Sequence, residues 1–264
     1  MNTFSPTEAI KFGWKTFKAN PGFLIGLIVI LILPSLIVSF LIPSPKIDQS
    51  NFTNLGPLFT AIFVSSLISG LISVLASLGV LKALLMFVDT GKGDFANILV
   101  PFKQTKILIN YFLAMLLIYG LSFFGIIVFG IITFITFGIG LLILIPVAIY
   151  LSIRISLFSF YIIDKAAGPV EALKLSWNDT KGNMINLMIF GFLSWCVMIL
   201  GMIALFVGLL AAVPVVLVAT IYVYKMLSQQ QAVQPAPVAP VAPVAPIAPV
   251  APMPQTPPPT MPAT

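Results

Sequence analysis

The sequence predicts an all-α integral membrane protein with six transmembrane helices. Hydrophobic residues make up 59% of the chain and charged residues only 8%, whereas a soluble domain carries about 25% charged residues. Several apolar runs exceed the roughly 20 residues that an α-helix needs to cross a bilayer. These runs do not alternate between apolar and polar residues as the strands of a membrane barrel do. Helices are therefore the expected spanning elements.

One phrase of 15 residues occurs twice. Residues 6–20 read PTEAIKFGWKTFKAN and residues 169–183 read PVEALKLSWNDTKGN. With a constant offset of 163, seven positions are identical: Pro6/Pro169, Glu8/Glu171, Ala9/Ala172, Lys11/Lys174, Trp14/Trp177, Lys18/Lys181 and Asn20/Asn183. Charged residues share one helical face, and a Trp lies on the apolar side. Both copies predict amphipathic helices on the membrane surface, over about 5–19 and 169–182. The first copy could instead be only the basic flank of the first span.

The start of the first copy carries the residues of a helix N-terminus. Ser5 is expected to cap the helix, and Pro6 suits its first position. Glu8 is placed to close a capping box with Ser5.

Six apolar segments are long enough to be spans. Residues 107–163 hold a single charge, Arg154, and at 1.5 Å per residue they are too long for one crossing. We place the break between their two spans near Thr136–Gly140. The expected spans are 21–42, 58–88, 107–135, 139–163, 184–207 and 209–227.

The surface helices and the spans suggest three repeats within a membrane domain of residues 1–228. Residues 94–106 resemble a degenerate third copy of the phrase, with Phe102 in the place of Trp14. Gly140-Leu141-Leu142 followed by Pro146 is echoed by Gly208-Leu209-Leu210 followed by Pro214. The predicted unit is one surface helix followed by two spans.

The cations predict the orientation. With six spans, one side of the membrane receives Lys11, Lys15, Lys18, Lys82, Lys92, Lys103, Lys106, Lys165, Lys174, Lys181 and Lys225, with Arg154 toward it, and the other side receives Lys46. The positive-inside rule makes the first side cytoplasmic. We expect a multi-pass protein of the prokaryotic plasma (inner) membrane with both termini in the cytoplasm.

Residues 229–264 form a tail of different composition. Proline recurs at every third position in APVAPVAPVAPIAPVAP, the period of a polyproline II helix. Such a segment cannot bury a core, so we expect it to be disordered. It is either a spacer or a docking site for a protein that binds proline-rich segments.

The residue types argue against catalysis and against cofactor, metal or nucleic-acid binding. The chain has no His and a single Cys, Cys196, inside an apolar run. The seven acidic residues all fall in expected loops or surface helices, away from any position where a nucleophile and base could meet inside the bundle. The cations lie at helix ends rather than in a basic run. We therefore expect no enzyme, and membrane lipids as the main partners.

Eight residues are candidates for functional or lipid-headgroup contacts. They are Arg154, Lys82, Trp14, Trp177, Lys11, Lys174, Glu8 and Glu171. Arg154 is the one ionisable residue that could lie deep in the membrane. Two placements are open: its side chain extends to the headgroups, or it is buried and contacts a helix, an anion or a lipid headgroup. Lys82 can extend to the headgroups in the same way.

Serines recur every four residues in the second expected span, at Ser65, Ser69, Ser73 and Ser77. Small residues at this spacing favour close helix packing. Hydroxyls on one helical face could instead line a polar pathway.

The region around the second copy resembles a known group of proteins. An arginine in a span, then Ile163-Asp164-Lys165, then GPVEALKLSWNDTKGN is similar to a broad group of prokaryotic six-span membrane proteins. The group includes the membrane domain fused to some glycerophosphoryl diester phosphodiesterases. The resemblance implies six spans. The phosphodiesterase chemistry of those proteins belongs to a separate soluble domain, so the resemblance implies no activity for this chain.

The sequence thus predicts a non-enzymatic structural or partner-binding membrane component. The alternative is a transporter or lipid-handling protein with a cavity near Arg154 and the serine face.

Overall fold

The structure is a computed structural model that describes residues 4–41, 55–204 and 207–233. All regular secondary structure in these residues is helical, as the sequence predicts. Five helices are long and apolar enough to cross a membrane, and a sixth is counted when α1 and α2 are taken as one bent segment. The proline-rich tail lies outside the described residues.

Six long helices form three hairpins. Their bounds are α2 Pro21–Leu41 with α3 Leu55–Thr90, α5 Thr105–Ile135 with α6 Leu141–Ile155, and α9 Met184–Ile203 with α10 Leu209–Val233. The shorter helices are α1 Pro6–Ala19, η1 Phe95–Leu99, α4 Val100–Lys103, α7 Phe158–Lys165 and α8 Pro169–Asp179. Between α1 and α2 the chain bends by 101° at Asn20. A sharp bend of this kind separates the amphipathic segment from the apolar one.

Two local expectations were wrong, and one span has an interruption that was not expected. Residues 94–106 do not form one amphipathic helix but a 3₁₀ turn and one α-helical turn, η1 and α4, because Pro101 has no backbone N–H to continue a helix. The expected span 139–163 corresponds to one candidate span, Leu141–Lys165, whose helix is interrupted at Ser156 and Leu157 between α6 and α7. The Ser5 hydroxyl makes no capping bond and instead lies 3.0 Å from the Thr7 hydroxyl.

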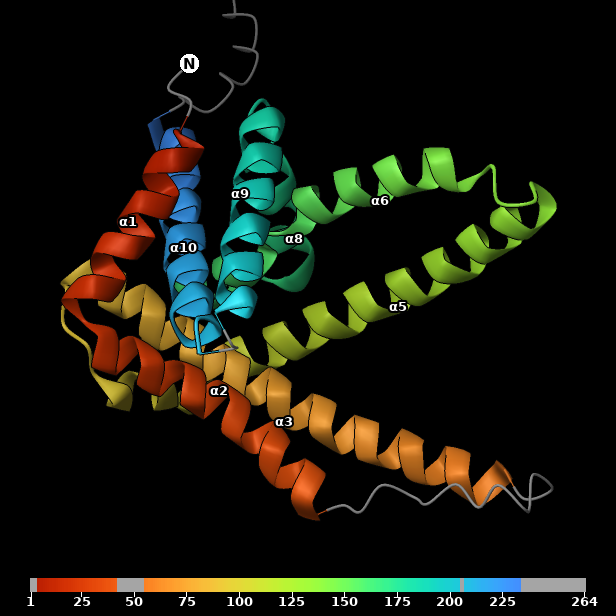
Figure 1. The fold of residues 1–264 in the computed structure, drawn as a ribbon, viewed down its shortest axis with the longest axis horizontal. Helices are drawn as coiled ribbons and strands as arrows, with labels where there is room; N and C mark the ends of the chain where they lie inside the picture. The colour runs from red at the N-terminus through yellow and green to blue at the C-terminus, as the bar shows by residue number, and fades with distance from the viewer. Residues whose placement is uncertain (1–3, 42–54, 205–206, 234–264) are drawn as a thin grey trace, which may run out of the picture.

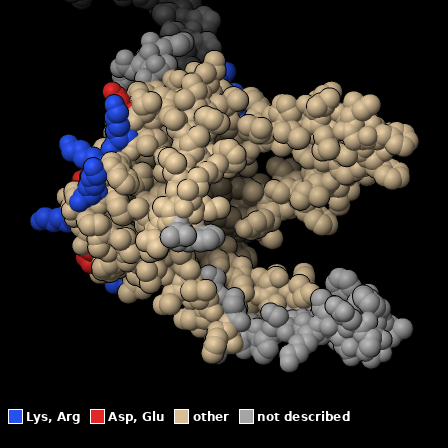
Figure 2. Space-filling view, in the orientation of Figure 1, with Lys and Arg blue, Asp and Glu red and all other residues tan. Residues whose placement is uncertain are grey.

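The hairpins splay apart (Figure 1). α2–α3 and α5–α6 project to the same side of the molecule, while α9–α10 runs at a steep angle to both of them. Figure 2 shows a group of blue Lys and Arg side chains at the left end of this face, whereas the described surfaces of the two projecting hairpins are tan, without charged residues. The molecule is therefore polarised, with a charged end and apolar arms.

The core lies where the hairpins meet. Fully buried side chains come from α2, α3, α7 and α10, including Leu24, Leu84, Ile162 and Val218. The ring of Tyr224 stacks on Phe160 with a centroid distance of 5.2 Å. Because α10 packs against α1, α2, α3, α8 and α9, it is the central helix of the described chain.

The short helices pack across the hairpins. α1 lies on α9 and α10, η1 and α4 lie on α3, and α8 lies on α5, α6 and α7. Each short helix thus contacts a hairpin other than the one that follows it in the chain. The closest approach is at Gly13 of α1, where an added Cβ would come 2.3 Å from the carbonyl oxygen of Val215. Only glycine fits at this crossing of α1 and α10.

Replacing Gly13 tests this crossing. Gly13→Ala forces the two helices apart and should lower the free energy of unfolding by about 1–3 kcal/mol. The control is Gly22→Ala in α2, where an added Cβ meets no atom within 4 Å; it should be neutral or stabilising by up to about 1 kcal/mol. Thermal unfolding in one detergent compares them. Equal midpoints for the two variants would show that α1 does not dock on α10.

Candidate functional site

The candidate site is the joint between α6, α7 and α8. The interruption at Ser156 and Leu157 leaves backbone groups without their helical partners. The Ser176 hydroxyl of α8 satisfies two of them: it donates to the Arg154 carbonyl at 2.7 Å and accepts from the Leu157 N–H at 3.2 Å. Ser176 is fully buried. The Ser176 side chain therefore links α8 to both sides of the break.

The guanidinium of Arg154 makes the second link to α8. Nη1 donates to the Trp177 carbonyl at 3.0 Å and to the Thr180 hydroxyl at 3.4 Å. Nε and Nη2 donate to the Tyr150 hydroxyl at 3.1 and 3.0 Å.

Two aromatic rings enclose the same guanidinium. Its carbon lies 5.1 Å from the ring centroid of Tyr150 and 5.1 Å from that of Trp177, within the range of a cation–π interaction. The residue is 7% exposed. Of the two placements that the sequence leaves open, the structure has the buried one, with a contact between helices.

The charge of Arg154 has no acidic partner in the described part of the chain. The ion pair found there joins Lys225 to Asp89, and the acceptors around Arg154 are a phenol, a carbonyl and a hydroxyl. Aromatic faces and neutral acceptors stabilise a guanidinium without removing its charge. The joint therefore keeps a positive charge at the C-terminal end of α6, which we call its base.

Asp179 lies near the C-terminal end of α8. It is 5% exposed, and neither carboxylate oxygen has a hydrogen-bond partner. Burial raises the pKa of Asp179 to about 7, because a charged carboxylate loses its hydration without receiving a donor. The Asn183 side-chain oxygen one turn later is also buried without a donor. This end of α8 is a place where a proton on the carboxyl stabilises the fold.

The end of α7 and the linker from α7 to α8 are tied to three other helices. Lys82 of α3 donates to the Ile163 carbonyl at 3.2 Å, and Asn110 of α5 donates to the Ala167 carbonyl at 3.2 Å. The Tyr224 hydroxyl of α10 donates to Asp164 at 3.0 Å. Lys82, which the sequence suggested as a headgroup contact, thus binds a backbone carbonyl of its own chain.

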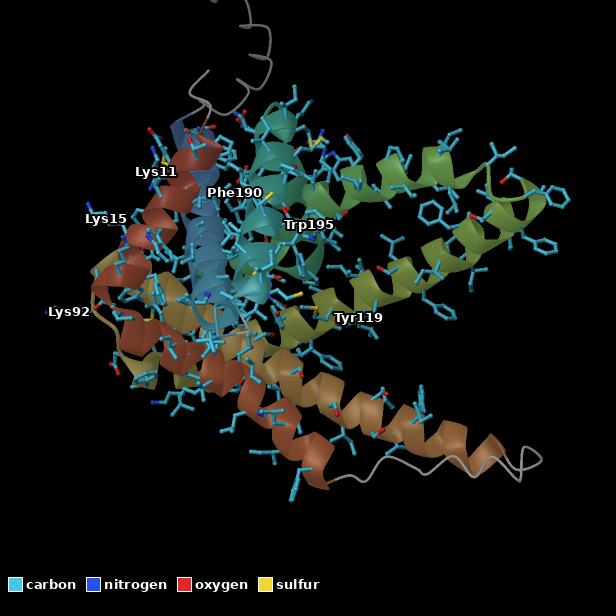
Figure 3. The ribbon with its side chains drawn as sticks, viewed as in Figure 1. Lys11, Lys15, Lys92, Tyr119, Phe190 and Trp195 are labelled. Atoms are coloured by element: carbon cyan, nitrogen blue, oxygen red, sulfur yellow. The ribbon has the colours of Figure 1, made fainter. Side chains whose placement is uncertain are left out.

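The remaining candidates lie on the exposed faces of the two phrase helices. Trp14 is 46% exposed and Trp177 39%, and four charged side chains are exposed: Glu8, Lys11, Glu171 and Lys174. The structure brings Trp177 to Arg154 but places the α1 residues on a different hairpin. Figure 3 shows Lys11 and Lys15 at the charged end of the molecule.

Small contacts complete the comparison between the two copies. The ammonium of Lys18 lies 5.3 Å over the Trp14 ring, and Glu171 accepts from the Gly168 N–H at 3.3 Å.

The serine row of α3 makes one contact with α5. The Ser77 hydroxyl lies 3.4 Å from the Tyr111 hydroxyl of α5, which is a helix-packing contact.

Sequence reasoning missed Tyr150, Ser176, Asp179 and Thr180. One signal was present: Ala172 and Ser176 of α8 and its C-cap residue Thr180 are spaced by four, so they share one side of the helix, and all three are buried. The described residues contain no cluster of three or more His, Cys, Asp or Glu that could hold a metal ion.

No family model, no curated protein and no solved structure matches the chain.

Arg154→Lys tests the joint. A lysine keeps the charge but cannot present a planar fork to Tyr150, Trp177 and Thr180 together. We expect a loss of about 1–3 kcal/mol in the free energy of unfolding. The control is Lys11→Arg on the exposed face of α1, which should change it by less than about 0.5 kcal/mol. Denaturant unfolding followed by tryptophan fluorescence gives both values, and an unchanged Arg154→Lys variant would contradict the joint.

Asp179→Asn tests the buried carboxyl. The folded pKa lies above the ordinary 3.8, so the folded state keeps a proton that the unfolded chain releases, and stability should fall as the pH rises from about 4 to 7. Asparagine removes this dependence. The thermal midpoint of Asp179→Asn should exceed that of the unchanged chain by an amount that grows from pH 5 to pH 8. Glu8→Gln, at an exposed carboxyl, should show no such trend; a constant difference for Asp179→Asn would refute the assignment.

Proposed function

We propose that the chain is a non-enzymatic, multi-pass structural or partner-binding component of the prokaryotic plasma membrane. The observation that supports this is the set of hydrogen bonds that Arg154 makes within its own chain. A charge within an apolar segment marks a functional site by default, and here its donors bind a phenol, a carbonyl and a hydroxyl of its own chain. It is used to join helices.

The proposal includes three repeats of a short surface segment and two spans; in the second repeat this segment is η1 and α4 rather than one amphipathic helix. Equivalent positions in the two copies support it: Ala9 and Ala172 are both fully buried, while Trp14 and Trp177 are both exposed. The packing order supports it too, because α1 lies on α9–α10, η1 and α4 lie on α3, and α8 lies on α5 and α6. The repeated phrase then serves to hold neighbouring units together.

The proposed orientation has the charged end in the cytoplasm. Lys11, Lys15 and Lys92 lie at this end, opposite the tips of α2–α3 and α5–α6 (Figure 3). The positive-inside rule then puts the tips of these two hairpins on the outer side. The C-terminus, and with it the proline-rich tail, would extend from the cytoplasmic side, where a protein partner can reach it.

Affinity purification in a mild detergent tests partner binding. The full chain is compared with a chain lacking residues 229–264 and with a control of unchanged length in which the prolines of 235–252 are replaced by serine. Proteins retained by the full chain and lost from both others are the expected result, because polyproline II geometry requires the prolines. A solute that co-purifies equally with all three, with no tail-dependent protein, would favour transport instead.

A further inference from the structure

The two helices α5 and α6 are joined at their tips but do not pack on each other. Figure 1 shows them diverging from the turn at residues 136–140 toward the body of the molecule, and Figure 2 shows an opening between them near their bases. No part of the most apolar 18-residue window of α5 is buried inside the molecule, and only 11% of that of the α6–α7 segment is. We call this opening the α5–α6 gap.

The walls of the gap are apolar and its base is cationic. No charged residue occurs between Lys106, in the first turn of α5, and Arg154, near the end of α6. Large exposed apolar side chains cover both helices, among them Phe112 and Leu116 of α5 and Ile143 of α6. At the base, α8 contacts both helices and places Trp177 beside Arg154.

An occupant of the gap must match both features. In a membrane the apolar walls cannot face a void or water, so something apolar fills the space between them. The base adds a second requirement, because Lys106 is exposed and Arg154 has no acidic partner in the described part of the chain. A helix from a second copy of this chain would fill the walls, but the acidic residues at the ends of its candidate spans, Asp89 and Asp164, already bind Lys225 and Tyr224. An anionic phospholipid supplies acyl chains and a negative headgroup in one molecule.

We propose that the α5–α6 gap binds an anionic phospholipid, with its acyl chains between the two helices and its phosphate at the base formed by Lys106, Arg154 and α8. Lys106 supplies the direct contact, because its ammonium is exposed. Arg154 supplies positive potential from its buried position. The rings of Tyr150 and Trp177 lie at the level where apolar chain and polar headgroup meet, the usual depth of such residues. This site goes beyond the proposed function and does not involve the proline-rich tail.

A photoactivatable lipid tests the site. The full chain is reconstituted in vesicles of phosphatidylcholine that contain a small fraction of phosphatidylglycerol with a diazirine in its acyl chain. After illumination, mass spectrometry compares labelling of α5 and α6 with labelling of α9, whose exposed residues Phe192 and Trp195 provide a matched apolar surface. We expect several-fold enrichment on α5 and α6. The same probe with a choline headgroup should label the three helices evenly.

Two variants connect the labelling to the charge at the base. Lys106→Gln should reduce the enrichment to near that of the choline probe, because one of the two cations is lost. Lys92→Gln, an exposed cation in the turn after α3, should leave it unchanged. Even labelling of all helices by the anionic probe, or equal effects of the two variants, would overturn the site. If a separate protein cross-linking reagent joins the α5 helices of two copies, and no lipid adduct forms there, the gap is assigned to a second copy.

Discussion

The hydroxyl of Ser176 is the contact on which the arrangement of the second half of the chain depends. Away from water, a backbone N–H or C=O without a partner is costly, and the break between α6 and α7 exposes both kinds. One side chain from α8 meets both needs. Because Ser176 is fixed, Trp177 and Thr180 are fixed with it, and they are the groups that receive Arg154. The charge of Arg154 is accommodated by a helix that was already held in place.

The first phrase solves the same packing problem without a hydrogen bond. α10 continues past α1 as one helix, so the backbone groups in its interior bond within the helix, except the Leu210 carbonyl, for which Pro214 has no N–H. Gly13, the equivalent of Ser176, therefore needs no polar atom and only has to allow close approach to Val215. A serine there would meet the carbonyl oxygen at a distance no Cβ can adopt. The two copies differ at this position because the hairpins beneath them differ.

Much of the helical framework could be predicted from sequence, and the joint could not. Prolines and glycines mark the helix ends, so α2, α5 and α9 begin or end within a few residues of the expected bounds. Hydropathy cannot show that α6 breaks at Ser156, because the residues on both sides are equally apolar. It also cannot show that Asp179 is buried, since the phrase is amphipathic on average and only tertiary packing selects which polar residue faces inward. The separation of α5 from α6 is likewise a tertiary property.

The phrase is constrained from two sides, and this explains which of its residues recur. Its inner positions must be small, as with Ala9 and Ala172, because each copy packs closely on a hairpin. Its outer positions carry the same glutamate, lysine and tryptophan, which suit a membrane surface. Positions that touch the particular hairpin are free to differ: Phe12 stacks on Tyr222, while its counterpart Leu175 packs against the core. A helix with one face packed on a neighbouring hairpin can vary on that face only where the neighbour varies.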